Sequence, residues 1–238
     1  MSKSVLSDKK NVNSMSLLVK MDSESIRKEV LTNIIKMVRY RGYLDKKKWN
    51  EKRISSLIKD RVYNNIYVIP LDIKITPDTN SPDNKNNKDN KDNKEEFDNK
   101  NIYVKLISQK INSVSSSPIV NDFLKQHSTK YKIIIFDDIS DRAKEGLKEY
   151  KHIEVFKEKF FMLDLLSIDA SPDYEILSDD DVIQLKKSYG IDNKKMKKMQ
   201  LKDPATMYLN LKRGQIVRII RNSEQNIKSI DYRRVCKS

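Results

Sequence analysis

One pattern of carboxylates and lysines in this chain has the spacing that metal-assisted hydrolysis uses. Asp72 and Lys74 form an acid-x-Lys pair in a β-rich stretch, and Asp60 is the upstream carboxylate that would complete the set. Carboxylate oxygens bind Mg²⁺, and a neighbouring lysine can help to position the attacking water. Acid-x-Lys recurs by chance in a lysine-rich chain, so the pattern is weak evidence. A magnesium-dependent nuclease is therefore only an alternative interpretation of this chain.

The counts of glycine, histidine and cysteine exclude several other chemistries. The four glycines, Gly42, Gly146, Gly190 and Gly214, are isolated, so no glycine-rich phosphate loop or dinucleotide fingerprint is present. Two histidines and one cysteine are too few for a Cys/His zinc site. The single Cys236 forms no intrachain disulfide, which favours a reducing intracellular compartment. We expect no cofactor, no bound metal and no small-molecule substrate.

The formal net charge of the 238 residues is +14, and the positive charge lies at the two ends of the chain. Residues 1–77 carry +9 and residues 186–238 carry +11, whereas residues 78–100 and 101–185 carry −2 and −4. Basic ends suit a chain that lies beside a polyanion or an acidic protein surface. A soluble lysine-rich surface and a free-standing basic nucleic-acid-binding protein remain alternatives. The sequence lacks the motifs of basic and interleaved aromatic residues by which proteins bind single strands, which counts against the second alternative.

These charged residues must be positioned by two folded parts. In the first, strands alternate with helices, which predicts an α/β layer domain. Ser23 is expected to cap its first helix, and Gly42 suits the position after that helix ends. Expected helices cover residues 24–41, 49–59, 117–127 and 141–150, and expected strands cover residues 66–75, 101–107, 131–136 and 152–156.

Two segments are expected to lie outside this domain. Residues 1–22 lack the apolar run of a signal peptide or a membrane span, and no later stretch supplies one, so we expect a flexible tail and no membrane partner. Residues 78–100 are almost free of apolar side chains and repeat an Asn-Lys-Asp unit. Such a segment cannot bury enough surface to offset its ordering entropy, which predicts a disordered loop whose deletion is tolerated.

The last part of the chain predicts a compact α+β module. Ser178 and Asp181 form a capping box, and Gly190 suits the end of the helix that follows. The pair Asp203-Pro204 marks the start of another helix. Residues 215–221 and 229–235 have the composition of two closing strands.

The segment from Leu201 to Val235 carries an ordered motif. Its matching positions are Asp203, Pro204, Tyr208, Lys212, Arg213, Gly214, Val217, Ile219, Ile220, Arg221, Ser223, Glu224, Tyr232 and Arg233. In order and spacing they resemble the C-terminal signature of the fifth subunit of multisubunit DNA-dependent RNA polymerases, a family that includes an archaeal counterpart. Arg41-Gly42-Tyr43 and Pro172 extend the resemblance upstream. It covers nearly the whole chain except residues 1–22 and 78–100.

Some positions depart from the family pattern. Ile168 and Tyr174 stand where histidines are usual, and Met207, Asn210 and Asn222 replace an Arg, a Gly and a Pro. The Leu-Pro-Arg-Ile segment of the family reads Met-Lys-Lys-Met at 196–199. These departures indicate a diverged member of eukaryotic type or from a large DNA virus.

The resemblance implies a non-catalytic polymerase subunit, since nucleotidyl transfer belongs to the two largest subunits. Residues 23–163 would form a three-layer, nuclease-like jaw domain near downstream duplex DNA. Residues 164–238 would form an assembly module that docks on the largest subunit, beside other polymerase subunits. The protein would then act in the nucleus or, for a virus, in the cytoplasmic viral factory and the virion.

Two sets of residues are candidates for these contacts. For DNA they are Ser140, Arg142 and Lys144 at a helix start, and Lys46, Lys47, Lys48 and Arg53 in a basic run. Asp138 and Asp141 would oppose phosphate at the helix start. For subunit docking they are Asp203, Pro204, Tyr208, Arg213, Gly214, Arg218, Arg221, Ser223, Tyr232 and Arg233.

Within the docking set, some residues are expected to have structural roles as well. Asp203 is expected mainly to cap a helix, and Tyr208 and Tyr232 are expected to be core aromatics with hydroxyls at the rim. Arg218, Arg221, Arg233 and Arg234 lie on two neighbouring expected strands, so some of them should point outward together.

Overall fold

The computed structural model describes most of the chain and divides it into two compact units. The described residues are 23–45, 47–59, 65–75, 98–166, 171–190, 195–222 and 228–237. Unit 1 runs to residue 35 and includes 49–71 and 75–162, and unit 2 comprises 36–48, 72–74 and 163 onward. Unit 2 thus includes two short segments upstream of the boundary expected near residue 163. The expected tail at 1–22 and most of the expected loop at 78–100 lie outside the described residues.

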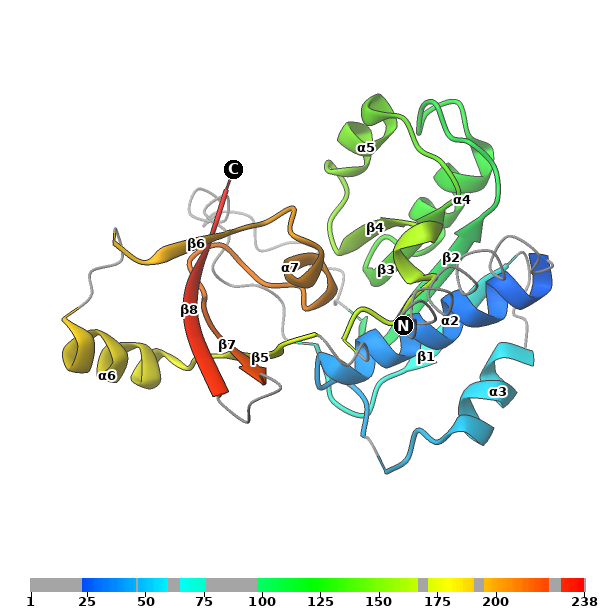
Figure 1. Ribbon diagram of the computed structural model, residues 1–238. Coiled ribbons are helices and arrows are strands. Elements are labelled where there is room, and N and C mark those ends of the chain that lie inside the picture. Colours follow the sequence, from blue (N-terminus) through cyan, green and yellow to red (C-terminus); the bar gives the residue numbers. More distant parts are fainter. Residues whose placement is uncertain are drawn as a thin grey trace, which may run out of the picture. The chain divides into compact units, whose positions relative to one another are not determined.

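Unit 1 is built on a mixed four-stranded sheet in the order β1-β2-β3-β4 (Figure 1). The strands are β1 (Ile66–Pro70), β2 (Asp98–Ile107), β3 (Lys130–Phe136) and β4 (Ile153–Lys157). β1 is antiparallel to β2, whereas β2, β3 and β4 are parallel. The apolar run of β3 is buried along nearly its whole length, as expected for a central parallel strand.

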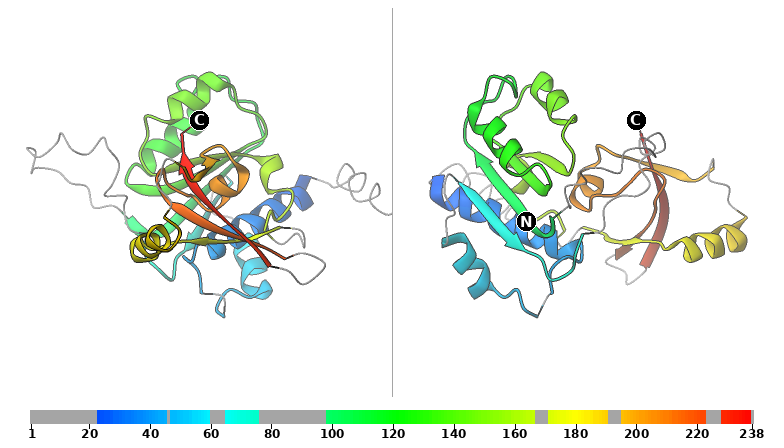
Figure 2. Two further views of the ribbon diagram at one scale, coloured as in Figure 1. Left: turned by 60° about the vertical axis from the view of Figure 1, so that its left-hand side comes forward. Right: turned by 180° about the vertical axis from the view of Figure 1, so that it is seen from behind.

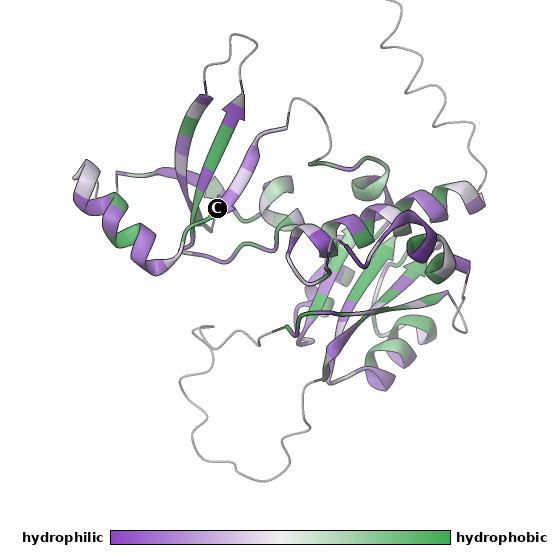
Figure 3. Cartoon of the chain, turned by 90° about the horizontal axis from the view of Figure 1, so that it is seen from below, coloured by the Kyte–Doolittle hydropathy of each residue, from purple (hydrophilic) through white to green (hydrophobic). Residues whose placement is uncertain are grey.

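Helices lie on both faces of this sheet. α4 (Pro118–Gln126) and α5 (Asp141–Leu147) bury Val120, Phe123 and Ala143 in one cluster with Ile134 and Phe136 of β3. α2 (Ser23–Tyr40) lies along the opposite face (Figures 1 and 2). The short helix η2 (Glu158–Phe161) joins it there, since Asn33 Nδ2 donates to the Phe161 carbonyl at 2.9 Å. Figure 3 shows how strongly apolar residues are concentrated in the strands.

The ends of several elements confirm or correct the sequence reading. The end of α2 is a Schellman turn: Gly42 has φ +81°, and the Tyr43 amide donates to the Val38 carbonyl at 3.2 Å. Ser23 is not the cap expected, because it already lies within the helix, whose described part begins there. α3 (Glu51–Lys59) begins two residues later than expected, where Asn50 Oδ1 accepts the Arg53 amide at 3.0 Å.

The expected strand at 66–75 and the loop at 78–100 also need correction. β1 is an edge strand that ends at Pro70, which has no amide to donate, so residues 71–75 are not in the sheet. β2 already begins at Asp98, so the last three residues of the expected loop belong to a strand. The expected helix at 141–150 ends at Leu147.

Unit 2 contains a second mixed sheet, in the order β5-β7-β8-β6. β7 (Ile216–Asn222) and β8 (Lys228–Cys236) form a long twisted antiparallel pair (Figure 2). The edge strands β5 (Asp173–Ile176) and β6 (Lys197–Gln200) were not expected, because each has only four residues and neither alternates cleanly. β5 is antiparallel to β7, and β6 is parallel to β8.

One helix packs on each face of this second sheet. α7 (Pro204–Tyr208) is next to a cluster with Val217, Ile219 and Val235, and α6 (Asp179–Tyr189) places Leu185 against Ile216 on the other face. The caps expected from the sequence are confirmed. Ser178 Oγ accepts the Asp181 amide at 3.2 Å, Asp203 Oδ1 accepts the Ala205 amide at 3.0 Å, and Gly190 has φ +59°.

Candidate docking surfaces and nucleic-acid contacts

Two of the motif positions form an internal clamp in unit 2, between the end of α2 and α7. Arg41 Nε donates to the Tyr208 carbonyl at 2.8 Å, and Arg41 Nη2 donates to the Met207 carbonyl at 3.0 Å. The last carbonyls of a helix have no partner within it, and a cation there also interacts favourably with the helix dipole. The motif pointed to Arg41 as a matching position, but nothing in the spacing indicated this role.

Tyr208 is the centre of this clamp rather than a docking residue at the rim. Its side chain is 0% exposed, and its hydroxyl donates to Asp164 Oδ1 at 3.1 Å. Lys36 Nζ lies 3.5 Å from the other oxygen of Asp164. Burial, followed by the negative charge of Asp164, raises the pKa of Tyr208 above its ordinary value. The expectation that Tyr208 is a core aromatic is confirmed, but its hydroxyl does not reach the surface.

The register of β7 and β8 divides the arginines between the two faces of the sheet. Arg218 pairs with Tyr232, whereas Arg233 pairs with Val217 and Arg221 with Ser229. Since directly paired residues share a face and neighbours along a strand alternate, Arg218 lies on the α6 face and Arg221 and Arg233 lie on the α7 face. The expected arginines therefore do not form a single docking surface.

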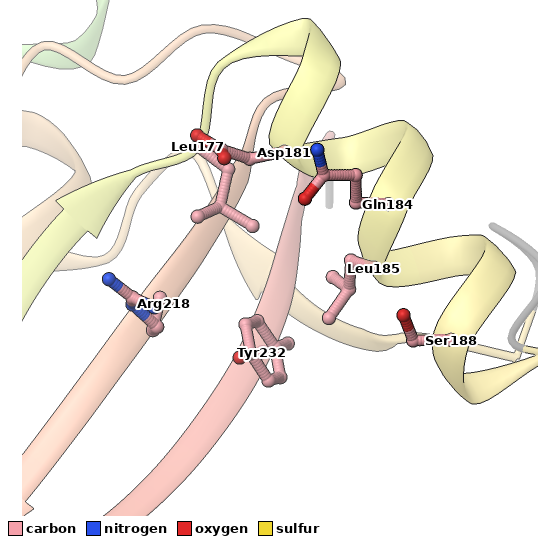
Figure 4. Close-up of a pocket in the computed structure, with 7 residues that line it drawn as sticks. All are labelled: Leu177, Asp181, Gln184, Leu185, Ser188, Arg218 and Tyr232. Carbon is pink, nitrogen blue, oxygen red and sulfur yellow. The ribbon is translucent and has the colours of Figure 1, made fainter.

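On the α6 face, an open groove of about 250 Å³ lies between the helix and the sheet (Figure 4). We call it the α6 groove; its lining residues are Leu177, Asp181, Gln184, Leu185, Ser188, Arg218 and Tyr232. Arg218 Nε donates to Glu175 Oε2 at 2.6 Å, which holds the guanidinium at one end. Tyr232 is thus only partly buried, as expected for an aromatic at a rim.

Two exposed apolar side chains border the α6 groove. The Tyr189 ring lies 6.2 Å from the Tyr232 ring, and Ile230 precedes Tyr232 by two residues on the same face of β8. Tyr189 is 64% exposed and Ile230 is 53% exposed. The groove itself is lined mainly by polar side chains, so these two residues supply exposed apolar surface beside a polar groove. Protein interfaces combine apolar and polar surface in this way.

The other docking candidates are scattered. On the α7 face, Arg233 Nε donates to Asp231 Oδ2 at 3.0 Å, and Arg221 is exposed. Arg213 and Gly214 form an exposed turn, in which Gly214 has φ +95°. Pro204 is the exposed first residue of α7. Ser223 lies outside the described residues.

At the start of α5, the candidate DNA contacts are mostly engaged by the protein itself. Ser140 Oγ accepts the Ala143 amide at 3.1 Å and donates to the Asn112 carbonyl at 2.7 Å, so its hydroxyl is used in capping. Lys144 lies 3.2 Å from Asp141. Arg142 is exposed and has no acidic partner among the described residues. It is the member of this group best able to reach a phosphate.

A local network also reduces the negative charge that faces this helix start. Lys110 and Lys157 lie 3.2 and 3.1 Å from the carboxylate of Asp138. Hydrogen bonds from Lys157 and then Lys110 hold the pKa of Asp138 below its ordinary value. Asp138, which was expected to oppose phosphate, is therefore partly neutralised.

The basic run after α2 is divided between the units. Lys47 and Lys48 belong to unit 2, where Lys48 lies 3.6 Å from Asp72, and Arg53 belongs to unit 1, where its guanidinium stacks 4.4 Å from the Trp49 ring centre. Lys47 is exposed, and Lys46 lies outside the described residues.

The acid-x-Lys pattern is not arranged as a metal site would need. Asp72 and Lys74 lie beyond the end of β1, not on a strand, which contradicts the expectation for a nuclease pair. The Asp72 carboxylate accepts the Asp45 amide at 3.0 Å and thus helps to hold the loop after α2. Asp60 lies outside the described residues, and within those described no three His, Cys, Asp or Glu side chains are grouped as metal ligands.

A buried lysine in unit 1 was not anticipated. Lys132 is 1% exposed, and its ammonium donates to the carbonyls of His127, Ser128 and Lys130 at 2.6, 3.1 and 2.8 Å. Burial lowers the pKa of Lys132 to about 8. The His127 ring stacks on Tyr103 at 4.5 Å, and burial, helped by nearby lysines, lowers the pKa of His127 to about 4. This cluster closes the C-terminal end of α4.

Among the described residues, no helix is long and apolar enough to span a membrane.

Comparison with known proteins places these features in context. Residues 163–235 match the family described as RNA polymerase Rpb5, C-terminal domain. Over 137 residues the chain is 34% identical to DNA-directed RNA polymerase subunit 5 of Acanthamoeba polyphaga mimivirus, a match that covers 57% of this chain and 66% of that protein. Over 129 residues it is 25% identical to the DNA-directed RNA polymerases I, II, and III subunit RPABC1 of Caenorhabditis elegans, covering 53% and 61%.

A plant relative is also similar to about half of the chain. The chain is 22% identical over 126 residues to DNA-directed RNA polymerase V subunit 5A of Arabidopsis thaliana, and this match covers 52% of the chain and 56% of the relative. In each of these three cases the chain matches less than two thirds of the relative's length.

Proposed function

The chain belongs to the RNA polymerase subunit 5 family, and we propose that it serves as a non-catalytic subunit of a DNA-directed RNA polymerase. The observation that carries this proposal is the match of residues 163–235 to the Rpb5 C-terminal domain, which spans the sheet, α6 and α7 of unit 2. The catalytic centre then lies on other subunits. The protein acts where that polymerase acts, in the nucleus or in the cytoplasmic factory and virion of a large DNA virus.

In this proposal, residues 164–238 form the assembly module and dock on the largest polymerase subunit. The exposed Tyr189 and Ile230 favour this face of the sheet, because the centre of a protein interface is apolar. The mostly polar lining of the α6 groove would then belong to the rim. Arg218, held in place by its ion pair with Glu175, supplies a fixed polar group at the rim. Arg221 and Arg233 lie on the opposite face from this groove and would serve other subunits.

For residues 23–163, the proposed role is that of a three-layer, nuclease-like jaw domain beside downstream duplex DNA. Arg142 is the side chain that best supports it, since it is exposed at the start of α5. Lys144 and Ser140 would act only after giving up the contacts they make within the protein.

Co-purification of a tagged full-length chain from its native source tests the subunit proposal. We expect the chain to elute within a large particle that contains the largest polymerase subunit. A chain that elutes alone would overturn the proposal.

Paired variants then test the docking surface. Tyr189→Ser with Ile230→Ser should abolish assembly with the largest subunit. The matched control is Tyr150→Ser with Ile119→Ser, which removes two exposed side chains of the same types from unit 1 and should leave assembly intact. If both double variants assemble normally, the α6 groove is not the docking surface.

A further inference from the structure

Unit 2 has a second distinctive surface, at the edge of the sheet formed by β6. Five exposed cations lie on β6 or on the segments bonded to its end: Lys198, Lys202, Lys212, Arg213 and Lys237. They come from three segments that hydrogen bonds hold together. The Leu201 amide donates to the Cys236 carbonyl at 3.1 Å, and the Gly214 amide donates to the Val235 carbonyl at 2.9 Å. We call this surface the basic edge.

The acidic side chains close to the basic edge are already engaged. Asp231 accepts hydrogen bonds or ion pairs from Lys197 at 2.9 Å and Arg233 at 3.0 Å. Asp203 caps α7 through the Ala205 amide. For Lys198 and Lys202, the described residues provide no acidic partner. The positive charge of Lys198 and Lys202 is therefore not balanced within the described part of unit 2.

An unmet hydrogen-bond donor lies next to these lysines. Arg234 is paired with Lys198 in the register of β8 and β6. Its Nε is buried and has no acceptor in the described part of the chain. A buried donor without an acceptor is costly unless a ligand or water supplies one. Because this Nε is buried on an inner strand, the exposed Lys198 beside it is the group that a ligand at this edge can reach.

The composition of the basic edge distinguishes between kinds of polyanion. None of the exposed large apolar side chains described in unit 2 belongs to it. A protein interface has an apolar centre in which lysine is depleted, whereas phosphate contacts require only Lys and Arg. Single-stranded nucleic acid is held largely by stacking on aromatic rings, and no exposed aromatic residue lies here among those described. We propose that the basic edge binds the phosphate backbone of duplex DNA, independently of sequence.

The dimensions of the edge fit such a ligand. Residues 195–202 span at most about 25 Å, since a strand rises roughly 3.3 Å per residue. Duplex DNA carries one charge for about every 1.7 Å of its axis, so several phosphates lie within this length. The contact adds to the jaw contact proposed above and comes from the other unit.

The test measures binding of the full-length chain to a short labelled duplex over a series of salt concentrations. The edge variant is Lys198→Gln, Lys202→Gln and Lys237→Gln. Each phosphate contact contributes about 0.9 to the slope of log K against log salt, so the slope should fall by about 2 to 3. The control is Lys28→Gln, Lys187→Gln and Lys228→Gln, which removes the same charge from other exposed positions and should keep the parent slope.

The following results would overturn the proposal. Equal slopes for the parent and the edge variant would place DNA binding elsewhere, and an equal fall in both variants would show a general effect of net charge. Tighter binding of single-stranded DNA would exclude a duplex site. An edge variant that keeps the parent slope but fails to assemble with the polymerase would make the edge a protein surface. Because DNA binding uses the isolated chain, its result is separate from that of the assembly test.

Discussion

Arg41 and Tyr208 lie 167 positions apart in the sequence, yet the Arg41 guanidinium is bonded to the Tyr208 carbonyl at 2.8 Å. The turn after α2 and the helix α7 are thereby part of one unit, although they come from opposite ends of the chain. Two positions that matched a family signature separately turn out to contact each other. This contact gives both positions a structural role within unit 2.

Removing the Arg41 guanidinium should destabilise unit 2. Arg41→Ala leaves two carbonyls of α7 without their charged donor, and such hydrogen bonds contribute about 1.5–3 kcal/mol each at most. We expect a loss of about 2 kcal/mol in the free energy of unfolding by urea. Arg213→Ala, at an exposed turn, should change it by less than about 0.5 kcal/mol. Equal losses in the two variants would contradict a specific clamp.

Tyr208→Phe isolates the buried hydroxyl. The ring still fills its site, but Asp164 loses a hydrogen-bond donor, so unfolding should become easier by about 1–2 kcal/mol. In the parent protein, this tyrosine should not ionise below the pH at which the chain unfolds, since burial and Asp164 raise its pKa. Ultraviolet titration of the two proteins checks this, and identical titration curves up to alkaline unfolding are the expected result.

His127 should make the stability of unit 1 sensitive to acid. Its pKa is about 4 in the folded state and near 6.5 in the unfolded state, so between these values the unfolded chain binds more protons. Stability should therefore fall as the pH is lowered from 6.5 towards 4. His127→Phe keeps a ring against Tyr103 and should flatten this part of the pH profile, as followed by thermal unfolding. An unchanged slope would show that other groups cause it.

Lys132 should also make the stability of unit 1 rise with pH, in the alkaline range. Its pKa is about 8 in the folded state and near 10.5 when unfolded, so the unfolded state holds the extra proton between pH 8 and 10.5. Its contribution to stability should rise over this interval, by at most about 1.4 kcal/mol per pH unit. Urea unfolding at several pH values, compared with Lys132→Met, measures this contribution as the difference between two profiles. Parallel profiles would contradict it.

The start of β2 sets a limit for loop deletion. Removing residues 78–97 should leave unit 1 folded, because β1 and β2 keep their full register. Removing residues 78–100 also takes the first three residues of β2 and the Lys100 carbonyl that accepts the Leu71 amide at 2.8 Å. The longer deletion should lower the thermal midpoint clearly, whereas the shorter one should not. Equal midpoints would show that these three residues contribute nothing.

Much of the fold could be predicted because its signals are local. The caps Ser178 and Asp203 and the turn at Gly42 each act within a few residues, and the sequence alone identified them. β5 and β6 could not be predicted, because four-residue edge strands are defined by the neighbours they pair with rather than by their own pattern. The acid-x-Lys stretch was misread as a strand because its apolar alternation continues past Pro70, where the sheet stops.

The candidate sites were harder to predict than the fold. The roles of Arg41 and Lys132 depend on contacts with carbonyls that no spacing rule reveals. The arginines of β7 and β8 were correctly placed on neighbouring strands. Their division between two faces depends on the register, and a shift of one residue would reverse it.

Because consecutive arginines of β7 emerge on opposite sides, this small sheet can be engaged from both sides at once. A neighbour seated against α6 would leave the far side and the β6 border open to a second one. Such a module works as a bridge between neighbours, and damage to one side should loosen one neighbour while the other stays attached.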